Sequence, residues 1–367
     1  MKEEKVKEGK KKKPFWKRLL KGIAIFLLAV IVFAGGMLAY LSITEFKPAD
    51  VETIKIREPS DVVFSGREIS ILTMNTGYAG LGEKSDFFMD GGKEVRPRSE
   101  SYVKENMAGI LEILKRVDAD FYLLQEVDSD SHRSYKTDQV SYYQNELGVT
   151  AAYAKNYACN FVPYPLPPIG KVDSGLLTLT GVKTELAERY QLPCPFSWPV
   201  SMANLKRALL VSHVPIEGSD KELVIINLHL EAYDDGEGKI KQTNMLVDIM
   251  EAEYAKGNYV IVGGDFNQNF PGGPDLYPIK NPDLWVPGTF SDGTLPDGWQ
   301  FAYDITTPTC RLLNQPLNLA DDATQLFVID GFILSPNIRL GSVETLDESF
   351  RYSDHNPVLL NVTLIDE

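Results

Sequence analysis

A glycine pair followed by an acid and an amide marks the stretch of this chain where residue types most clearly predict chemistry. The apolar run 260–262 leads into Gly263 and Gly264, and Asp265 and Asn267 follow directly. Such a β-branched run predicts a buried strand, and the glycines indicate a change of backbone direction at its end. A carboxylate beside a carboxamide suits metal-assisted hydrolysis, because Asp can orient or deprotonate water and Asn can hold a substrate oxygen. The alternative is an ordinary turn, for which Gly, Asp and Asn are the usual residues.

Four further predicted strand ends carry residues of the same kinds. They are Asn75, Glu126, His229 and the adjacent pair Asp354 and His355. Strand ends that gather at one edge of a sheet can assemble a site from residues that are distant in sequence. We therefore expect these side chains to meet in one pocket.

The elements that must position these residues follow from apolar periodicity. Helical spacing predicts amphipathic helices over 101–117 and 239–256 and a short helix over 139–147. Strands are expected at 67–75, 121–126, 172–180, 207–214, 223–230, 260–267, 325–334 and 358–364. The Tyr- and Pro-rich segment 156–169 is expected to be irregular, and the Pro- and Gly-rich segment 268–308 to form an ordered wall or lid. Helices separated by groups of strands favour a layered α/β or α+β domain.

The order of the polar motifs resembles the endonuclease/exonuclease/phosphatase superfamily, which includes deoxyribonucleases, neutral sphingomyelinases and inositol polyphosphate 5-phosphatases. The resemblance covers about residues 67–365 and rests on six motifs in order. These are Met74-Asn75, Gln125-Glu126, Asn227-Leu228-His229, Gly264-Asp265-Phe266-Asn267, Ile329-Asp330 and Ser353-Asp354-His355-Asn356-Pro357. It implies an α/β fold, a four-layer sandwich of two packed mixed β-sheets flanked by helices. It also implies divalent-metal hydrolysis of a phosphoester.

The resemblance also implies roles for individual residues. Glu126 would be the main Mg²⁺ ligand, with Asn75 close by and Asp354 completing the site; Mn²⁺ and Ca²⁺ are alternative ions. Asp265 and Asn267 would activate the attacking water or manage the leaving-group proton. His355, oriented by Asp330, would contact the scissile phosphate, and His229 would stabilise charge on the phosphoryl oxygens. Hard carboxylate oxygens suit this chemistry, because a cation must neutralise an anionic phosphoester before a nucleophile can attack.

Four further residues are weaker candidates for substrate binding. Arg207 and Arg311 are expected to reach the phosphate, with surface ion pairs as the alternative. Tyr157 and Asn160 lie where related enzymes often keep a phosphate-contacting Tyr and Asn, although the local pattern here differs.

The N-terminal part predicts a membrane anchor. Residues 1–21 are Lys-rich, and the uncharged run 22–41 would span about 30 Å as a helix, the thickness of a bilayer core. A cleaved signal peptide is the alternative, but its apolar region is usually only about 7–15 residues long. We expect a single-pass protein of the cell membrane, with a cytoplasmic head (1–21), an anchor (22–41), a tether (42–66) and an extracytoplasmic catalytic domain (67–367).

Charge narrows the choice of substrate. The chain carries a net charge of −14, and residues 1–21 hold ten basic and three acidic side chains, so −21 falls on the remainder. Such an acidic domain will not attract polyanions in bulk, which makes nucleic acid a less favoured partner. A phospholipid headgroup or another small phosphodiester is the expected substrate. Extracellular DNA and a catalytically silent binding module are the alternatives, and the oligomeric state stays open. The three cysteines are expected to be small core residues.

Overall fold

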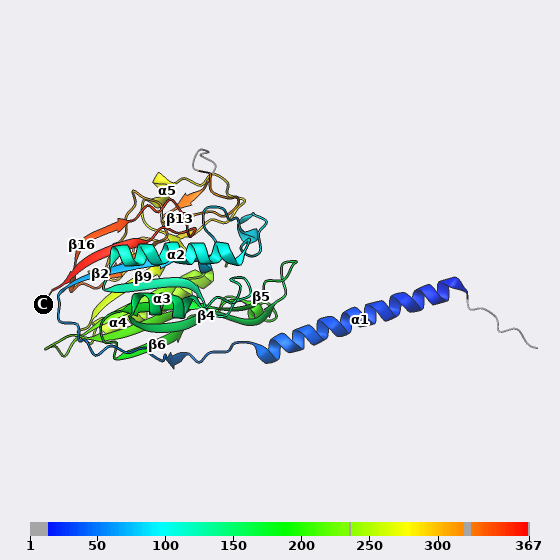
Figure 1. Cartoon of the computed structure of the whole chain (residues 1–367), viewed down its shortest axis with the longest axis horizontal. Coiled ribbons are helices and arrows are strands. Elements are labelled where there is room, and N and C mark those ends of the chain that lie inside the picture. The colour runs from blue at the N-terminus through cyan, green and yellow to red at the C-terminus, as the bar shows by residue number, and fades with distance from the viewer. Residues whose placement is uncertain (1–13, 235, 319–323, 366–367) are drawn as a thin grey trace, which may run out of the picture. The chain divides into compact units, whose positions relative to one another are not determined.

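The computed structural model describes residues 14–234, 236–318 and 324–365 (Figure 1). The chain divides into two units, Met1–Glu45 and Phe46–Glu367. Residues 1–13, which hold most of the predicted basic head, lie outside the described part.

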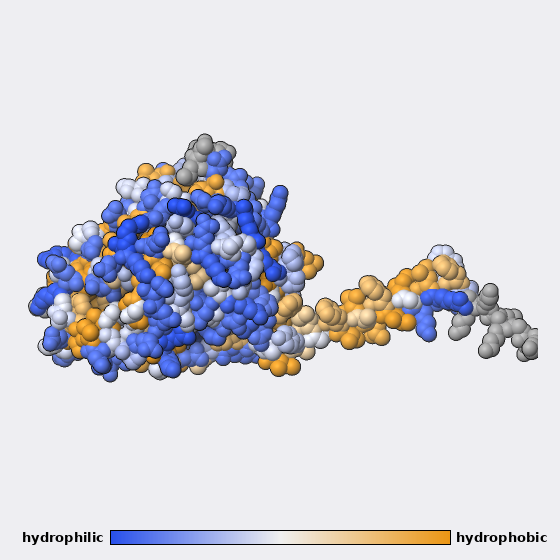
Figure 2. Space-filling model, viewed as in Figure 1, coloured by the Kyte–Doolittle hydropathy of each residue, from blue (hydrophilic) through white to orange (hydrophobic). Residues whose placement is uncertain are grey.

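The first unit contains one long apolar helix, α1 (Phe15–Thr44). It is long and apolar enough to cross a membrane, and it contains the predicted anchor 22–41. Figure 2 shows apolar surface along most of this helix and hydrophilic surface near its first residues. A signal sequence near an N-terminus meets the same criteria of length and composition.

The second unit is built on two mixed sheets. The first has the strand order β1 (Val51–Thr53), β6 (Leu186–Gln191), β7 (Ala208–Pro215), β8 (Glu222–His229), β9 (Tyr259–Asp265), β15 (Asp330–Leu334) and β12 (Gln300–Ala302). The second has the order β16 (Ile338–Thr345), β17 (Val358–Leu364), β2 (Glu68–Asn75), β3 (Phe121–Asp128), β5 (Gly170–Thr180) and β4 (Thr150–Val162). Each sheet has one parallel pair, β8 with β9 and β2 with β3, and its other pairs are antiparallel.

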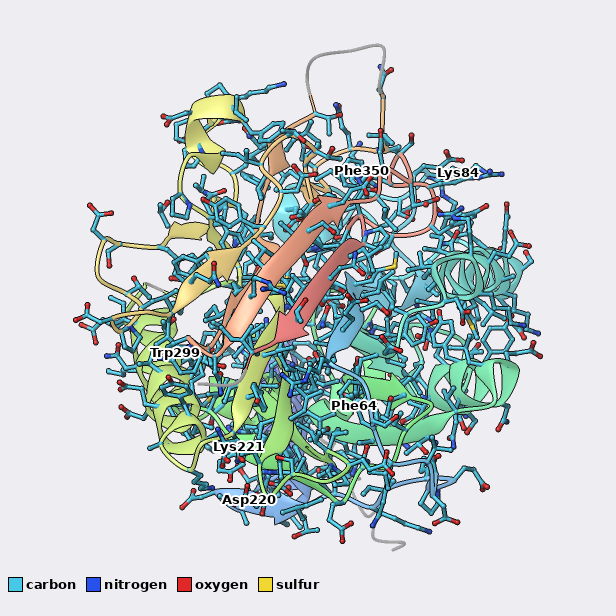
Figure 3. All side chains as sticks on the ribbon, turned by 90° about the vertical axis from the view of Figure 1, so that its left-hand side faces the viewer. Phe64, Lys84, Asp220, Lys221, Trp299 and Phe350 are labelled. Carbon is cyan, nitrogen blue, oxygen red and sulfur yellow. The ribbon has the colours of Figure 1, made fainter. Side chains whose placement is uncertain are left out.

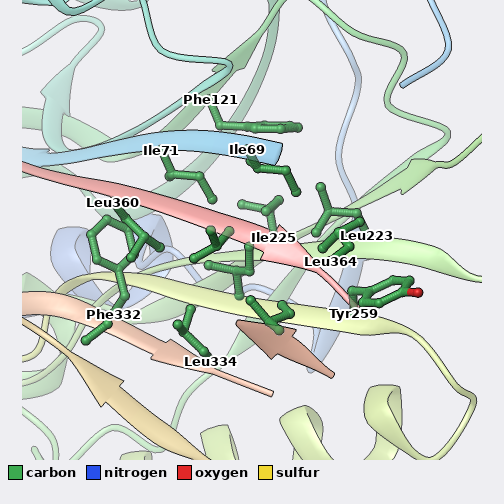
Figure 4. Close-up of a cluster of buried hydrophobic side chains, with 14 of the residues drawn as sticks. Ile69, Ile71, Phe121, Leu223, Ile225, Tyr259, Phe332, Leu334, Leu360 and Leu364 are labelled. Carbon is green, nitrogen blue, oxygen red and sulfur yellow. The ribbon is translucent and has the colours of Figure 1, made fainter. Parts of the chain in front are cut away.

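The two sheets pack face to face over an apolar core. Figure 4 shows Ile71 and Phe121 from one sheet opposite Ile225 and Phe332 from the other. These side chains are fully buried, and burial of each such group contributes about 1.5–3 kcal/mol. This core holds the ends of strands from both sheets in register with one another.

Helices cover the outer faces and complete four layers (Figure 3). Helices α2 (Glu100–Val117) and α3 (Gln139–Leu147) pack on the second sheet, and α4 (Glu237–Tyr254) packs on the first. Helix α2 begins where Ser99 accepts a hydrogen bond from the Tyr102 amide, as a capping serine should. The predicted four-layer sandwich of two mixed sheets flanked by helices is confirmed.

Several local expectations need correction. The segment 42–66 is not a free tether, since β1 pairs with β6 and Phe64 is buried in the core between the sheets. The segment 156–169 is not wholly irregular, because its first half belongs to β4 and pairs with β5, and its prolines begin only at Pro163. Of the three cysteines, only Cys159 and Cys310 are buried, and Cys194 is exposed.

The predicted strand 325–334 is interrupted between β14 (Leu326–Phe327) and β15. The carbonyls of Val328 and Ile329 accept hydrogen bonds from the amides of Phe270 and Phe266, so the backbone there leaves the ladder. The segment 268–308 is an ordered wall, as expected: it holds β10 (Gln268–Asn269), α5 (Gly273–Leu276), β11 (Gly288–Thr289) and β12. Trp299 packs against Tyr254 of α4.

Candidate active site

The ends of strands from both sheets meet at one pocket. In the first sheet, His229 pairs with Asp265 across β8 and β9, and Asp330 pairs with Asp265 across β15 and β9. Asn75, at the end of β2 in the second sheet, donates from Nδ2 to Asp265 Oδ2 at 3.0 Å. Strand register and sheet packing therefore bring together residues that lie as many as 255 positions apart, from Asn75 to Asp330.

A buried amide network fixes the two sheets relative to one another beside the pocket. Gln125 of β3 donates from Nε2 to Asn227 Oδ1 of β8 at 2.9 Å. Asn227 donates in turn to the Leu177 carbonyl of β5 at 3.1 Å. Both amides precede site residues in the sequence, so this network sets the positions of Glu126 and His229.

Asp265 is the centre of the polar cluster. Its Oδ1 accepts from the Asn267 amide at 2.9 Å, and its Oδ2 lies 3.3 Å from His229 Nε2 and 3.8 Å from His355 Nε2. The preceding Gly264 has φ +151° and an added Cβ would lie 2.1 Å from the Leu228 carbonyl oxygen, so only glycine fits there. Burial and the neighbouring Asp330 raise the pKa of Asp265 to about 6. A carboxylate with a pKa near neutrality is suited to accept a proton.

His355 forms a buried pair with Asp330. The His355 Nδ1 atom lies 2.8 Å from Asp330 Oδ2, which leaves Nε2 directed toward Asp265 and Asp354. Burial lowers the pKa of His355, but the Asp330 carboxylate together with Cys310 and Asp354 more than offsets this, so the pKa lies well above its ordinary value. The imidazole is therefore held as a cation with Nε2–H available in the pocket.

His229 has the opposite protonation state. Burial, followed by the positive charge of Arg207, lowers its pKa well below the ordinary value. Its Nδ1 has no hydrogen-bond partner among the described residues. The two histidines beside Asp265 thus differ in charge at neutral pH, one neutral and one protonated.

Glu126 and Asp354 are the acids placed to hold a cation. Glu126 lies in the register shift between Leu124 and Val127 of β3 and has φ +54°, an uncommon backbone conformation that directs its side chain into the pocket. The Asn75 amide lies 3.5 Å from Glu126 Oε1. Asp354 approaches the backbone at Gly77, where an added Cβ would lie 2.8 Å from its Oδ1.

The chemistry of this donor set fits a divalent ion. Burial and the nearby Glu126, partly offset by His355, raise the pKa of Asp354 to about 7. A bound cation would stabilise the charged form of an acid that is buried beside another carboxylate, as Asp354 is. Asp265, Asp330 and His355 also bring one ligand atom each within 4.8 Å of one another. In that group Asp330 already accepts a hydrogen bond from His355, an arrangement that fits a catalytic pair better than a metal site. Glu126 and Asp354 are therefore the better candidates for metal ligands.

Of the four weaker candidates for substrate binding, three lie at the pocket and one does not. Arg207, Arg311 and Tyr157 line the pocket, whereas Asn160 is exposed on β4 and is not part of it. Arg311 donates to the carbonyls of Gly82 and Ser85, at 2.8 and 3.2 Å, so it also holds a loop in place. Tyr157 donates from its hydroxyl to the Ala203 carbonyl at 2.9 Å.

Asn156 and Arg133 are among the pocket residues that the sequence did not indicate. Asn156 is buried at the pocket, and its Oδ1 has no partner among the described residues. Arg133 binds Asp128 through two hydrogen bonds, lies 3.8 Å from Glu126 Oε2 and covers the Tyr78 ring at 3.8 Å. No pattern in the sequence points to Arg133. Asn156 could have been found, because buried and exposed positions alternate along this part of β4: Ala154 is buried, Lys155 is exposed and Asn156 is buried.

The fold and the pocket define a four-layer α/β sandwich with a polar site at the strand ends. The model of the Endonuclease/Exonuclease/phosphatase family matches residues 90–355, and the chain belongs to this family. Members of the family are generally metal-dependent hydrolases.

Solved structures share the fold at low sequence identity. An endonuclease/exonuclease/phosphatase from Beutenbergia cavernae is 17% identical, with a TM-score of 0.56, and the match covers 82% of this chain and 72% of that one. A family protein from Leptotrichia buccalis is 14% identical, with a TM-score of 0.54 and coverage of 81% and 100%. The human nocturnin catalytic domain with bound sulfate is 16% identical, with a TM-score of 0.50 and coverage of 85% and 97%. None of the curated proteins matches the chain in sequence.

Proposed function

We propose that this protein is a membrane-anchored, Mg²⁺-dependent phosphoester hydrolase whose catalytic domain lies outside the cytoplasm. The observation that carries the proposal is the convergence of Asp265, His229 and the His355–Asp330 pair on one pocket beside Glu126 and Asp354. The proposed orientation in the membrane rests on the basic residues at the N-terminal end, which favour the cytoplasmic side. Mg²⁺ is proposed because it prefers one or two carboxylate ligands together with water and substrate oxygens.

The residues divide the work of hydrolysis among them. Glu126 and Asp354 would hold the cation, with Asn75 beside Glu126, and a bound Mg²⁺ would neutralise the phosphoryl oxygens. Asp265, held in place by Asn75 and the Asn267 amide, accepts the proton of the attacking water. The water oxygen bonds to phosphorus, and the bond to the leaving oxygen breaks.

The two histidines stabilise the charge that develops on phosphorus. His355 is protonated and presents Nε2–H to a phosphoryl oxygen, while Asp330 holds its ring orientation through Nδ1. His229 is neutral and lies beside Asp265, where it can donate to a phosphoryl oxygen without attracting the Asp265 proton. Loss of one such donor typically lowers the rate by about 10²–10³.

The pocket favours a small or lipid-linked phosphoester over a long polyanion. Apolar and aromatic side chains line part of its wall, namely Leu81, Phe87, Leu205, Tyr233, Trp285 and Leu313. The strongly acidic charge of the chain beyond residue 21 works against bulk attraction of DNA.

A substrate panel tests the function. The full chain would be assayed on bis(p-nitrophenyl) phosphate, sphingomyelin, inositol phosphates and DNA, with Mg²⁺ and with EDTA. We expect cation-dependent hydrolysis of a small or lipid phosphodiester that the Asp265→Asn variant loses. Equal turnover in EDTA, or equal turnover by the variant, would overturn the proposal, and a preference for DNA would establish the nuclease alternative.

A further inference from the structure

Large apolar side chains are exposed on three segments around the pocket. The segments are the loop 86–98, the tip 163–169 of the β4–β5 hairpin and the loop 193–206 after β6. The exposed side chains, called here the apolar rim, are Met89, Tyr164, Leu166, Trp198 and Val200. Leu166 is 84% exposed and Trp198 62%, values that are unusual for side chains of this size.

Each rim segment also lines the pocket. Phe87 lies two positions before Met89, Ile169 lies at the base of the hairpin tip, and Leu205 lies near the end of the third segment. The apolar rim therefore borders the pocket, and its side chains continue the apolar wall of the pocket onto the surface.

Two of the segments contact each other, and the third packs on the strand that leads into the hairpin tip. The Phe88 and Tyr164 rings lie 6.0 Å apart edge to face, and Arg96 donates to the Pro168 carbonyl at 3.1 Å. The third segment packs against β4, where Tyr157 donates to the Ala203 carbonyl. Figure 1 shows the β4–β5 hairpin projecting from the body of the second unit. The rim is thus a defined surface rather than a set of scattered residues.

The chain from α1 enters the second unit next to the third rim segment. Only six residues separate the end of α1 at Thr44 from the start of β1 at Val51, a reach of about 20 Å. Val51 pairs with Tyr190, and the Gln191 amide donates to the Asp50 carbonyl at 2.8 Å. The third rim segment follows β6 directly, so the short connection and this part of the rim lie at the same end of the sheet.

We propose that the apolar rim docks on the outer leaflet of the membrane that holds α1, so that the pocket opens toward the lipid headgroups. This inference rests on the membrane anchoring in the proposed function. A connection of only six residues between α1 and β1 keeps this end of the sheet close to the bilayer, where Trp and Tyr side chains are favoured at the level of the headgroups. Transfer of Leu166 and Val200 from water into the acyl boundary adds hydrophobic stabilisation.

The tryptophans of the chain allow a direct test. The four tryptophans are Trp16, Trp198, Trp285 and Trp299. Trp16 belongs to α1, Trp285 lines the pocket and Trp299 is buried, so Trp198 is the exposed tryptophan of the second unit. The full-length Trp16→Phe variant would be placed in phosphatidylcholine–phosphatidylglycerol vesicles, with brominated or ordinary acyl chains. We expect at least a twofold quenching by the brominated lipids that disappears in Trp16→Phe/Trp198→Phe.

The outcomes separate this inference from the proposed function, since the readout requires no hydrolysis. Quenching of Trp198 by aqueous iodide but not by brominated lipid would overturn the docking. Protection from both quenchers would also overturn it, because another protein surface would then cover the rim. Resistance of the protein to extraction by alkaline carbonate tests the anchor separately.

A pair of single variants provides a second, matched test. Leu166→Ser removes an exposed apolar side chain of the rim, whereas Leu276→Ser removes one that is 55% exposed on α5, outside the rim segments. We expect Leu166→Ser to reduce lipid quenching of Trp198 and Leu276→Ser to leave it unchanged. Equal effects of the two variants would contradict a specific role of the rim.

Discussion

The Asp330→Asn substitution tests the charge state of His355. The variant keeps the size of the side chain and a carbonyl oxygen that can accept from His355 Nδ1 at the observed 2.8 Å, but it removes the negative charge. A hydrogen bond to a charged group contributes about 1.5–3 kcal/mol, and one pKa unit corresponds to about 1.4 kcal/mol. The pKa of His355 should therefore fall by about one to two units.

The sign of the effect on activity follows from the role of the protonated form. His355 acts as a cation, so activity is lost as pH rises through its pKa, which Asp330 holds well above the ordinary value. In Asp330→Asn the alkaline limb of kcat/KM should move to lower pH by about one to two units. The measurements are the pH dependence of kcat/KM and an NMR titration of the His355 ring. Asp275→Asn, at an exposed position of α5, is the matched control.

An alkaline limb that stays in place would refute this reasoning. A uniform loss of kcat without a shift in the pH profile would show that Asp330 only supports the local structure. A fall in the His355 pKa without loss of activity would show that the protonated imidazole has no part in catalysis.

Three further predictions concern the pocket. Asp265→Asn should lower kcat by about 10² or more with little change in KM, measured on bis(p-nitrophenyl) phosphate; a change in KM alone would contradict its role as proton acceptor. Asn156→Ala should lower activity about tenfold or more, because Asn156 is buried at the pocket and its side-chain oxygen has no partner among the described residues. The control Asn160→Ala should leave activity unchanged in the same steady-state assay, and equal effects of the two variants would contradict the placement of Asn156 in the site. Without divalent ions, the free energy of unfolding should fall between about pH 4 and pH 7. The reason is that the folded pKa values of Asp265 (about 6) and Asp354 (about 7) exceed the unfolded value near 4, so the folded chain binds more protons than the unfolded chain in this window. Each such group lowers the free energy of unfolding by at most about 1.4 kcal/mol per pH unit, and Mg²⁺ should restore stability at pH 8. Denaturation curves recorded with EDTA and with Mg²⁺ measure this effect. A free energy of unfolding that does not change with pH would contradict the raised pKa values of the two acids.

Local patterns predicted the elements that have strong periodicity. The helix over 139–147 and the strand over 358–364 agree with α3 and β17 residue for residue, because a capping Asp138, the terminal Gly148 and clear alternation mark their ends. The motif residues at the strand ends were also predicted, and apart from Asp330, which lies behind His355, they line one pocket.

Features that depend on distant pairing were not predictable in the same way. β1 has only three residues, and its strand conformation comes from pairing with β6 more than 130 positions later. The same holds for Arg133, whose partners Glu126 and Tyr78 are fixed by the end of β3 and the loop after β2. Asn160 was chosen by a resemblance in position, but the alternation along β4 directs it to solvent.

The most direct test of the central claim is the position of a bound metal ion. A crystal of the protein soaked in Mn²⁺ would locate the ion by anomalous scattering, with Glu126→Gln as the matched variant. We predict a peak bound by Glu126 in the pocket, close to Asp354 and Asp265, that is lost in the variant. A peak elsewhere in the molecule, or an unchanged peak in Glu126→Gln, would contradict the assignment of this pocket as a metal-dependent active site.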